Sequence, residues 1–289
     1  MTTTREIHRP RPSLRRYVRR YLTGPFGALD ALGRQSWFFG EAFAWTPRAA
    51  RRYSREQVRL IAEVGMSNGT LAVVGGSAII TLFITFFAGV TGGVQTYRAL
   101  ADLNLEALGG FTSAIISPRL LTPIISGAAL AATVGTGFTA QLGAMRISEE
   151  IDALEVMGIR SMPYLVSTRV VAGMICVGPI FAMSLCGAWV GWKVTQVDFF
   201  GLSEGTYDHY MYTFMQPTDI LFSFIQAVFV AIVVILIHTY YGYNASGGPA
   251  GVGEAVGKAV RTSLVAVLTV QLCVAMALYG GTNTFRISG

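Results

Sequence analysis

Residues 139–163 read TAQLGAMRISEEIDALEVMGIRSMP, a charged segment set between two long apolar stretches. Ser148 is positioned to accept hydrogen bonds from the free backbone amides at the start of a helix. Gly158 is positioned to end that helix. The segment therefore predicts a short helix over about 148–158, roughly three turns long.

This short helix has two faces of different chemistry. Apolar residues and a glycine recur at the spacing of one helical face, and they are Ile147, Ile151, Leu154 and Gly158. Acidic residues fall on another face, and they are Glu149, Asp152 and Glu155. Glu149 and Glu150 also stand near the N-terminus, where a helix favours negative charge. We expect one face to pack on the protein and the other to meet water or a partner.

The composition around this segment is that of a membrane protein. Of the 289 residues, 52% are hydrophobic and 13% are charged, which departs strongly from the averages of soluble domains. Several long stretches lack Asp, Glu, Lys and Arg, and each can cross roughly 30 Å of hydrocarbon as a helix of about 20 residues. They are too continuously apolar for barrel strands, whose side chains alternate. The predicted spans cover about 65–90, 107–132, 165–192, 219–241 and 262–280.

Basic residues before the first span predict the orientation. Counting along the sequence, 13 of the 22 Lys and Arg residues precede residue 60. The positive-inside rule then places the N-terminus in the cytoplasm, and an odd number of spans places the C-terminus on the extracytoplasmic side. The helix at 148–158 accordingly lies on the cytoplasmic side. Membrane anchoring accounts for the net charge of +6, and nucleic acid is not an expected partner.

The chain divides at the start of the first span. Residues 1–63 mix Arg with aromatic residues, which is typical of amphipathic helices lying in the membrane interface. A break at Pro47 is expected to separate two such helices, and a solvated basic tail is the alternative. Residues 64–289 hold the spans. The predicted fold is therefore all-α: a polytopic membrane protein with an N-terminal interfacial amphipathic helix, five transmembrane helices and a short cytoplasmic helix.

Arg119 is a charge inside the second predicted span. An arginine in a spanning segment is costly, usually faces the bundle interior or a watery cavity, and pairs with another group. The alternative is that Arg119 snorkels from the end of its helix. Gln95, after the first span, either lines a cavity mouth or belongs with Tyr97 to an ordinary interfacial group.

Other ionisable residues point to no catalytic site and no metal site. Asp198, Glu204, Asp208 and His209 follow the third span without the spacing of metal ligands, so we interpret them as interfacial decoration. His238 is interpreted as a satisfied interfacial histidine rather than a proton relay. The cysteines lie in apolar runs, which predicts neither a disulfide nor a metal site.

Motifs in and around the charged segment carry a resemblance to a known family. The central motifs are Thr139-Ala140-Gln141-Leu142-Gly143-Ala144-Met145 and Glu149-Glu150-Ile151-Asp152-Ala153-Leu154-Glu155-Val156-Met157-Gly158. The flanking motifs are Gly93-Val94-Gln95-Thr96-Tyr97, Arg119 to Pro123, Arg169, and Gly251-Val252-Gly253 with Ala255. With the order of spans, these motifs resemble the MlaE family, the permease subunits of lipid-moving ABC transporters.

A few positions depart from the family pattern. Gln141 stands where many members have Glu, Leu120 where Glu follows the arginine, Thr133 where Arg is common, and Thr168 where Pro precedes Arg169. These changes remove charge from the membrane interior. They resemble the YrbE branch, in which two non-identical permease copies pair and work with Mce proteins.

The resemblance implies the partners and the mechanism. Two permease subunits would form the transmembrane unit, cytoplasmic ABC ATPase subunits would bind ATP beneath it, and extracytoplasmic Mce proteins would form a tunnel for lipid. The chain would lie in the bacterial inner membrane, bind no cofactor and catalyse no reaction itself. Tilting of the second and third spans would transmit closure of the ATPases to a lipid cavity.

The resemblance also implies two sets of site residues. The cytoplasmic helix would bind the ATPase through acidic and apolar residues, namely Glu149, Glu150, Asp152, Leu154, Glu155, Met157 and Gly158, with Ile151 completing the apolar seat. A lipid cavity toward the outer side would be lined by Gln95, Leu100, Leu103 and Arg119. The Arg119 guanidinium would there hold an anionic headgroup.

Two other classes of function are alternatives. A membrane-embedded lipid-modifying enzyme would need a nucleophile or base at the cavity, but His209 and His238 fall on opposite sides of the membrane in this topology. A non-transporting membrane scaffold would show no ATPase activity that responds to lipid. Fatty acids, mycolate-type lipids, sterols and phospholipids all remain candidate substrates of a transporter.

Overall fold

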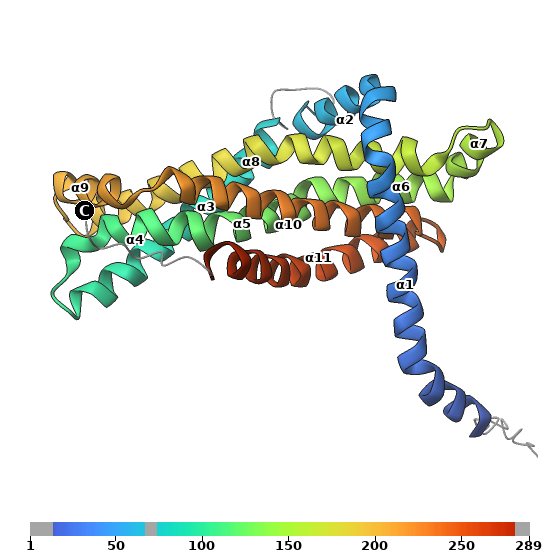
Figure 1. The fold of residues 1–289 in the computed structure, drawn as a ribbon, viewed down its shortest axis with the longest axis horizontal. Helices are drawn as coiled ribbons and strands as arrows, with labels where there is room; N and C mark the ends of the chain where they lie inside the picture. Colours follow the sequence, from blue (N-terminus) through green and yellow to red (C-terminus); the bar gives the residue numbers. More distant parts are fainter. Residues whose placement is uncertain (1–13, 67–73, 281–289) are drawn as a thin grey trace, which may run out of the picture. The chain divides into compact units, whose positions relative to one another are not determined.

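The computed structural model describes residues 14–66 and 74–280, and every regular element in these ranges is a helix (Figure 1). This finding confirms the all-α prediction. The chain divides after Glu41 into two units. The helix α1 (Leu14–Arg52) begins in the first unit and ends in the second, which also holds all the elements that follow.

Among the described residues, five helical segments are long and apolar enough to cross a membrane, as predicted. They are Ile79–Ala101, Glu106–Ile147, Met162–Phe199, Pro217–Tyr243 and Gly248–Tyr279. The last four begin earlier than predicted, because an uncharged run marks only the part of a helix that suits hydrocarbon while the helix itself continues into the interface. Residues 67–73 of the predicted first span lie outside the described residues.

The elements follow one another in this order. α2 (Ser54–Met66) precedes the first span, which is α3 (Val74–Ala101). The second span consists of η1 (Glu106–Leu108), α4 (Gly109–Ile116), η2 (Ser117–Leu121), α5 (Thr122–Leu130), η3 (Ala131–Gly135) and α6 (Thr136–Ile147). The third consists of η4 (Met162–Ser167), α8 (Thr168–Lys193) and η5 (Val194–Phe199), and the last two are α10 (Pro217–Tyr243) and α11 (Gly248–Tyr279). The connecting helices α7 (Glu150–Val156) and α9 (Glu204–Phe214) lie at opposite ends of the bundle (Figure 1).

The predicted break at Pro47 is wrong, because α1 continues through this residue to Arg52. A proline inside a helix removes one hydrogen bond of the ladder. Packing on either side of it outweighs that loss, since Ala42 and Ala49 of the same helix are buried. The corner to α2 comes later, and the Gln57 amide fixes it by donating to Ala49 O at 2.8 Å.

α3 and α8 pack closely because glycines leave no side chain between them. A Cβ on Gly191 would lie 2.1 Å from Phe86 O, and one on Gly89 would lie 2.3 Å from Ala188 O. Small residues at such an interface allow helix backbones to approach in lipid, where packing rather than water exclusion drives association. The first and third spans are therefore held together by backbone contact.

The second span is not a regular helix, since π-helical turns interrupt it at η2 and η3. Pro118 lies in the first of these turns, and its carbonyl accepts a hydrogen bond from Ser223 Oγ of α10 at 2.5 Å. A neighbouring helix thus satisfies backbone that the proline loosens, which is how prolines are tolerated in spans. π-helical turns frequently mark functional positions, and this one contains Arg119.

Candidate functional site

The helix α7 is anchored on the bundle by its apolar face. Ile151 is fully buried and packs with Leu142 of α6 and Leu165 of η4. Leu154 is half-buried against the same cluster. The predicted packing face is confirmed at Ile151 and Leu154, and burial of an isoleucine side chain contributes about 2 kcal/mol to holding this element in place.

The start of α7 differs from the prediction, and its end agrees with the prediction. Ser148 does not cap α7, because its hydroxyl donates to Ala144 O at 3.0 Å at the end of α6. Glu149 instead has a φ of 61°, so the chain turns sharply and α7 has only 7 residues, about two turns. Gly158, with a φ of +76°, ends the segment as predicted. Ile147 belongs to α6 and is 37% exposed, so it does not join the packing face.

The outward side of α7 presents two apolar side chains among carboxylates. Val156 is 89% exposed and Met157 is 66% exposed. Glu149 and Glu150 are also exposed. We call Val156 and Met157 the apolar tip. Exposed apolar side chains on a short acidic helix at the end of a membrane bundle have the composition of a protein contact surface.

Polar bonds tie α7 to three other elements. Arg146 of α6 forms an ion pair with Asp152, with 2.7 Å between Nη1 and Oδ1. Ser161 donates to Glu155 Oε1 at 2.6 Å, and the Ser161 and Tyr243 hydroxyl oxygens lie 2.7 Å apart. Tyr243 is the last residue of α10. A displacement of α7 therefore acts directly on α6 and on the start of η4, and through Ser161 on the end of α10.

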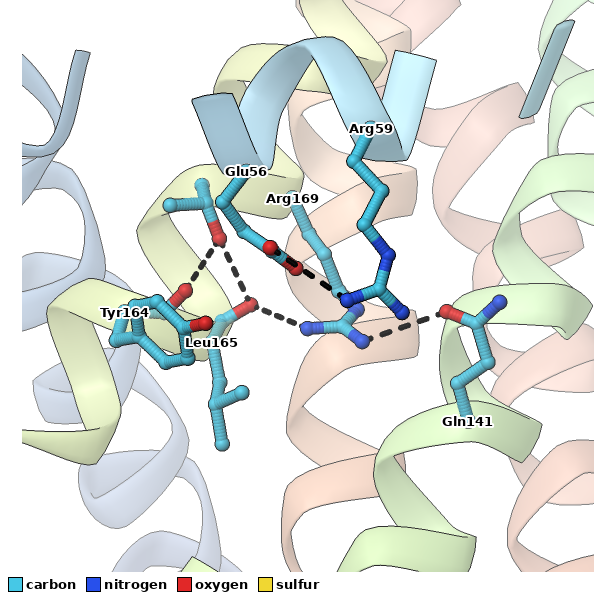
Figure 2. A network of polar contacts seen from close by, with 7 residues as sticks. Glu56, Arg59, Gln141, Tyr164, Leu165 and Arg169 are labelled. Atoms are coloured by element: carbon cyan, nitrogen blue, oxygen red, sulfur yellow. Dashed lines mark hydrogen bonds and ion pairs between the residues drawn. The ribbon is translucent and has the colours of Figure 1, made fainter. Parts of the chain in front are cut away.

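Gln141, one of the departures from the family pattern, lies in a second polar network beside α7 (Figure 2). Arg169 is 4% exposed, and it donates to Leu165 O at 2.8 Å and to Gln141 Oε1 at 3.3 Å. Glu56 and Arg59 of α2 form an ion pair of 3.7 Å nearby. A pocket of about 500 Å³ opens between these residues. At position 141 a glutamate would place a carboxylate against a buried guanidinium, whereas glutamine offers a neutral acceptor.

Arg119 belongs to a polar cluster near the other end of the bundle. Its Nη2 atom donates to both carboxylate oxygens of Asp219, at 2.8 and 3.1 Å. The Tyr279 ring centroid lies 5.0 Å from the guanidinium carbon. Gln271 of α11 donates to Arg119 O at 3.4 Å and also to Gln226 Oε1 of α10. We call these five residues the polar cluster.

The ion pair of this cluster faces the bundle interior. The side chain of Arg119 is 15% exposed and that of Asp219 is 4% exposed. This burial supports the interior pairing of Arg119 over snorkelling. Sequence reasoning missed Asp219, because it stands at the start of the apolar run of α10 and was interpreted only as the boundary of a span. One signal was available: Asp219 is an acidic residue at the edge of an apolar run, so it could pair with the arginine inside another span.

The other predicted lipid-binding residues lie on or beside the end of α3. Gln95 is exposed, Leu100 is half-buried, and Leu103 is 66% exposed in the connection to η1. The polar contacts of Arg119 are with α10 and α11 rather than with these residues. Within one chain the predicted set thus divides into a partly exposed group at the end of α3 and an inward-facing arginine.

The acidic residues after the third span bind a lysine. Lys193 Nζ lies 2.9 Å from Glu204 Oε1 and 3.0 Å from Asp208 Oδ1. Tyr207 of α9 is fully buried, and burial raises its pKa to about 12. Its hydroxyl therefore stays protonated and donates to Ser113 Oγ at 2.8 Å. The ion pairs join α9 to α8 and the tyrosine hydrogen bond joins it to α4, so these residues have structural roles.

His238 is fully buried near the end of α10. Its Nδ1 atom lies 2.8 Å from Thr139 Oγ1, and its Nε2 atom lies 3.2 Å from Ser263 Oγ. The ring also packs against Gly135, where an added Cβ would lie 2.6 Å from His238 Cδ2. Both nitrogens are occupied, as the interpretation of a satisfied histidine required, and this arrangement ties α6, α10 and α11 together.

Several known proteins have sequences similar to this chain. Residues 66–277 match the family described as permease MlaE. A probable ABC transporter permease protein of Synechocystis sp. is 24% identical over 82% of this chain and 85% of its own length. The intermembrane phospholipid transport system permease protein MlaE of Haemophilus influenzae is 28% identical over 71% of this chain and 78% of its own length. The chloroplastic protein TRIGALACTOSYLDIACYLGLYCEROL 1 of Arabidopsis thaliana is 26% identical over 70% of this chain and 58% of its own length.

Proposed function

We propose that this chain, which belongs to the permease MlaE family, moves lipid as the membrane-spanning subunit of an ABC-type transporter. It is a multi-pass inner-membrane protein and a transporter subunit rather than an enzyme. The relative in Haemophilus influenzae is named for phospholipid transport, which supports lipid as the substrate class here. ATP would be hydrolysed by a separate cytoplasmic subunit.

The observation that carries the proposal is the position of α7 between the irregular second and third spans. Ile151 anchors the helix on the bundle, while Val156 and Met157 extend from it. Exposed apolar side chains at the centre of a charged rim supply most of the energy of a protein contact. A groove of the ATPase with basic groups at its edge would accept this tip and the carboxylates around it.

α10 links α7 to the polar cluster. Tyr243 at its end contacts Ser161 beside α7, and Asp219 in its first turn holds Arg119. The 24 residue steps from 219 to 243 correspond to about 36 Å along a helix. Closure of the ATPase against α7 would therefore reach Arg119 through one rigid element, and packed helices shift between discrete arrangements.

The polar cluster supports a contact with a lipid headgroup. Arg119 Nε has no hydrogen-bond partner among the described residues, although it is buried. An anionic phosphate or carboxylate that approaches the guanidinium would compete with Asp219 for it. Gln95, Leu100 and Leu103 at the end of α3 would line the path of the acyl chains. Exchange of Asp219 for a headgroup would then couple lipid binding to the position of α10.

The rest of the assembly is part of the same proposal. The basic residues before α3 support a cytoplasmic N-terminus, which places α7 on the ATP side. A second permease, most simply a non-identical copy that retains charge where this chain has Gln141 and Leu120, would complete the cavity. Mce proteins on the extracytoplasmic side would carry the lipid onward.

Copurification of the ATPase tests the role of the apolar tip. Val156→Asp with Met157→Asp places charge on the tip without touching the buried anchor Ile151, so at least about tenfold less ATPase is expected to copurify. Val58→Asp, on a valine that is 65% exposed on α2, is the matched control and is expected to retain the partner. Undiminished ATPase in the tip variant contradicts the proposed contact.

Charge reversal on α7 gives a second arm of the same test. Replacing Glu149, Asp152 and Glu155 by Lys is expected to abolish copurification while the permease stays folded. ATPase activity that depends on this chain and rises with lipid separates a transporter from a membrane scaffold. Conversion of lipid to a new product by the purified chain would favour the enzyme alternative.

A further inference from the structure

A basic pocket lies between the end of α1 and the connection from α7 to η4. Its volume is about 550 Å³, within the range of small-ligand sites. Arg48, Arg52 and Arg160 line it, and no Asp or Glu does. All three side chains are exposed, and none forms an ion pair with another described residue. Positive charge is thus gathered here without a counter-charge.

An aromatic wall holds two of these guanidinium groups in place. The guanidinium carbons of Arg48 and Arg160 each lie 5.1 Å from the ring centroid of Trp45. A cation–π contact leaves N–H groups of the guanidinium free to donate to an anion. Tyr53 and Tyr164 extend the wall, with ring centroids 5.3 Å apart. The pocket therefore combines oriented cationic donors with amphipathic aromatic rings.

We propose that this pocket binds the phosphate of an anionic phospholipid from the leaflet on the α7 side of the membrane. Guanidinium donors match phosphate oxygens in pairs, and the anion relieves repulsion among the arginines. The span Met162–Phe199 begins two residues after Arg160, which places the pocket at the height of the headgroups. Phe43, 52% exposed on the same helix as Trp45, suits the acyl boundary beside them.

A headgroup in this pocket would also contact the element that we propose for coupling. Leu154 and Gly158 from α7 and its end, together with Ile159, line the same pocket. An occupied pocket would tie the end of α1 to α7 and so set the position from which α7 meets the ATPase. This consequence for transport rests on the proposed function, whereas binding of the lipid does not.

Native mass spectrometry of the full chain in detergent tests the binding without ATPase or transport. The probes are short-chain phosphatidylglycerol, short-chain phosphatidylcholine and inorganic phosphate. We expect phosphatidylglycerol to be retained over phosphatidylcholine. Arg48→Gln with Arg160→Gln is expected to weaken this retention at least about twenty-five-fold, since each guanidinium would donate a charge-assisted hydrogen bond to the phosphate and such a bond contributes at least about a factor of five.

The matched control is Arg51→Gln with Arg55→Gln, which removes the same charge from exposed positions next to the pocket. It is expected to change retention by about twofold or less. Equal losses in the two variants, or equal retention of the two lipids, would contradict a built anion site. Displacement of phosphatidylglycerol by inorganic phosphate at equal concentration would assign the pocket to a free anion and overturn the lipid proposal. Failure of an ATPase or transport assay leaves this result standing, because binding is measured on the chain alone.

Discussion

Removing Asp219 while Arg119 stays in place tests how the polar cluster is held together. The Asp219 side chain is 4% exposed and the Arg119 side chain is 15% exposed, so the pair is shielded from water. Truncating one partner of a buried pair costs about 3–5 kcal/mol, because the other charge stays buried without a counter-charge. Asp219→Leu is expected to lower the free energy of unfolding by about 3 kcal/mol, the lower end of this range, since the Tyr279 ring still lies beside the guanidinium.

A double-mutant cycle isolates the pair itself. Arg119→Met alone is expected to lower the free energy of unfolding about as much as Asp219→Leu. The double variant leaves no unpaired charge in this pair, so its loss of stability is expected to be about 2 kcal/mol smaller than the sum of the two single losses. The readout is thermal unfolding in lipid nanodiscs, followed by tryptophan fluorescence. A loss of about 3 kcal/mol lowers Tm by roughly 6–12 °C in a chain of this size.

Two results would refute this account of the cluster. Strict additivity of the two single variants would show that the charges do not interact. Single variants that each cost less than about 1 kcal/mol would show that the site is well solvated. The folded double variant also separates the proposed roles of Arg119: retained lipid transport would assign the pair to architecture alone, and lost transport with intact folding supports a headgroup contact.

Three further perturbations address the packing and the polar network. Gly191→Ala is expected to lower Tm by about 4–8 °C in circular dichroism melts, because its methyl group would lie 2.1 Å from Phe86 O. The control Gly178→Ala meets no atom within 4 Å and should change Tm little. Equal shifts would contradict the close α3–α8 contact. Ile151→Ala is expected to lower the free energy of local unfolding of α7 by about 2–5 kcal/mol and so to speed hydrogen exchange there. Unchanged exchange would show that Ile151 does not anchor the helix. Gln141→Glu is expected to raise Tm by about 2 °C, because it places a carboxylate near Arg169 Nη2, which lies 3.3 Å from Gln141 Oε1. A lowered Tm would contradict that geometry.

The sequence predicted those features that leave a local pattern. Uncharged runs marked the spans because hydrocarbon excludes charge over the length of a helix. The spacing of Ile151 and Leu154 marked the packing face of α7, since side chains three or four residues apart share one side of a helix. Family motifs also predict that this segment contacts an ATPase, and that contact stays a prediction.

What sequence reasoning missed depends on contacts between distant parts of the chain. Asp219 follows Arg119 by 100 residues, and no local spacing connects the two. The left-handed turn at Glu149 is an uncommon conformation for this residue type, so a serine cap before it was the simpler expectation. The uninterrupted α1 shows a related effect, because burial on both sides of Pro47 outweighs the local preference of proline.

The most direct test of the central claim is ATP-driven lipid transfer by the complete complex in proteoliposomes, measured with a fluorescent phospholipid. Wild type is expected to move the lipid only with ATP. The variant with Val156→Asp and Met157→Asp is expected to lose at least about tenfold in rate while its spans stay folded. ATP-dependent transfer that proceeds equally without this chain, or with the apolar tip replaced, would contradict the account.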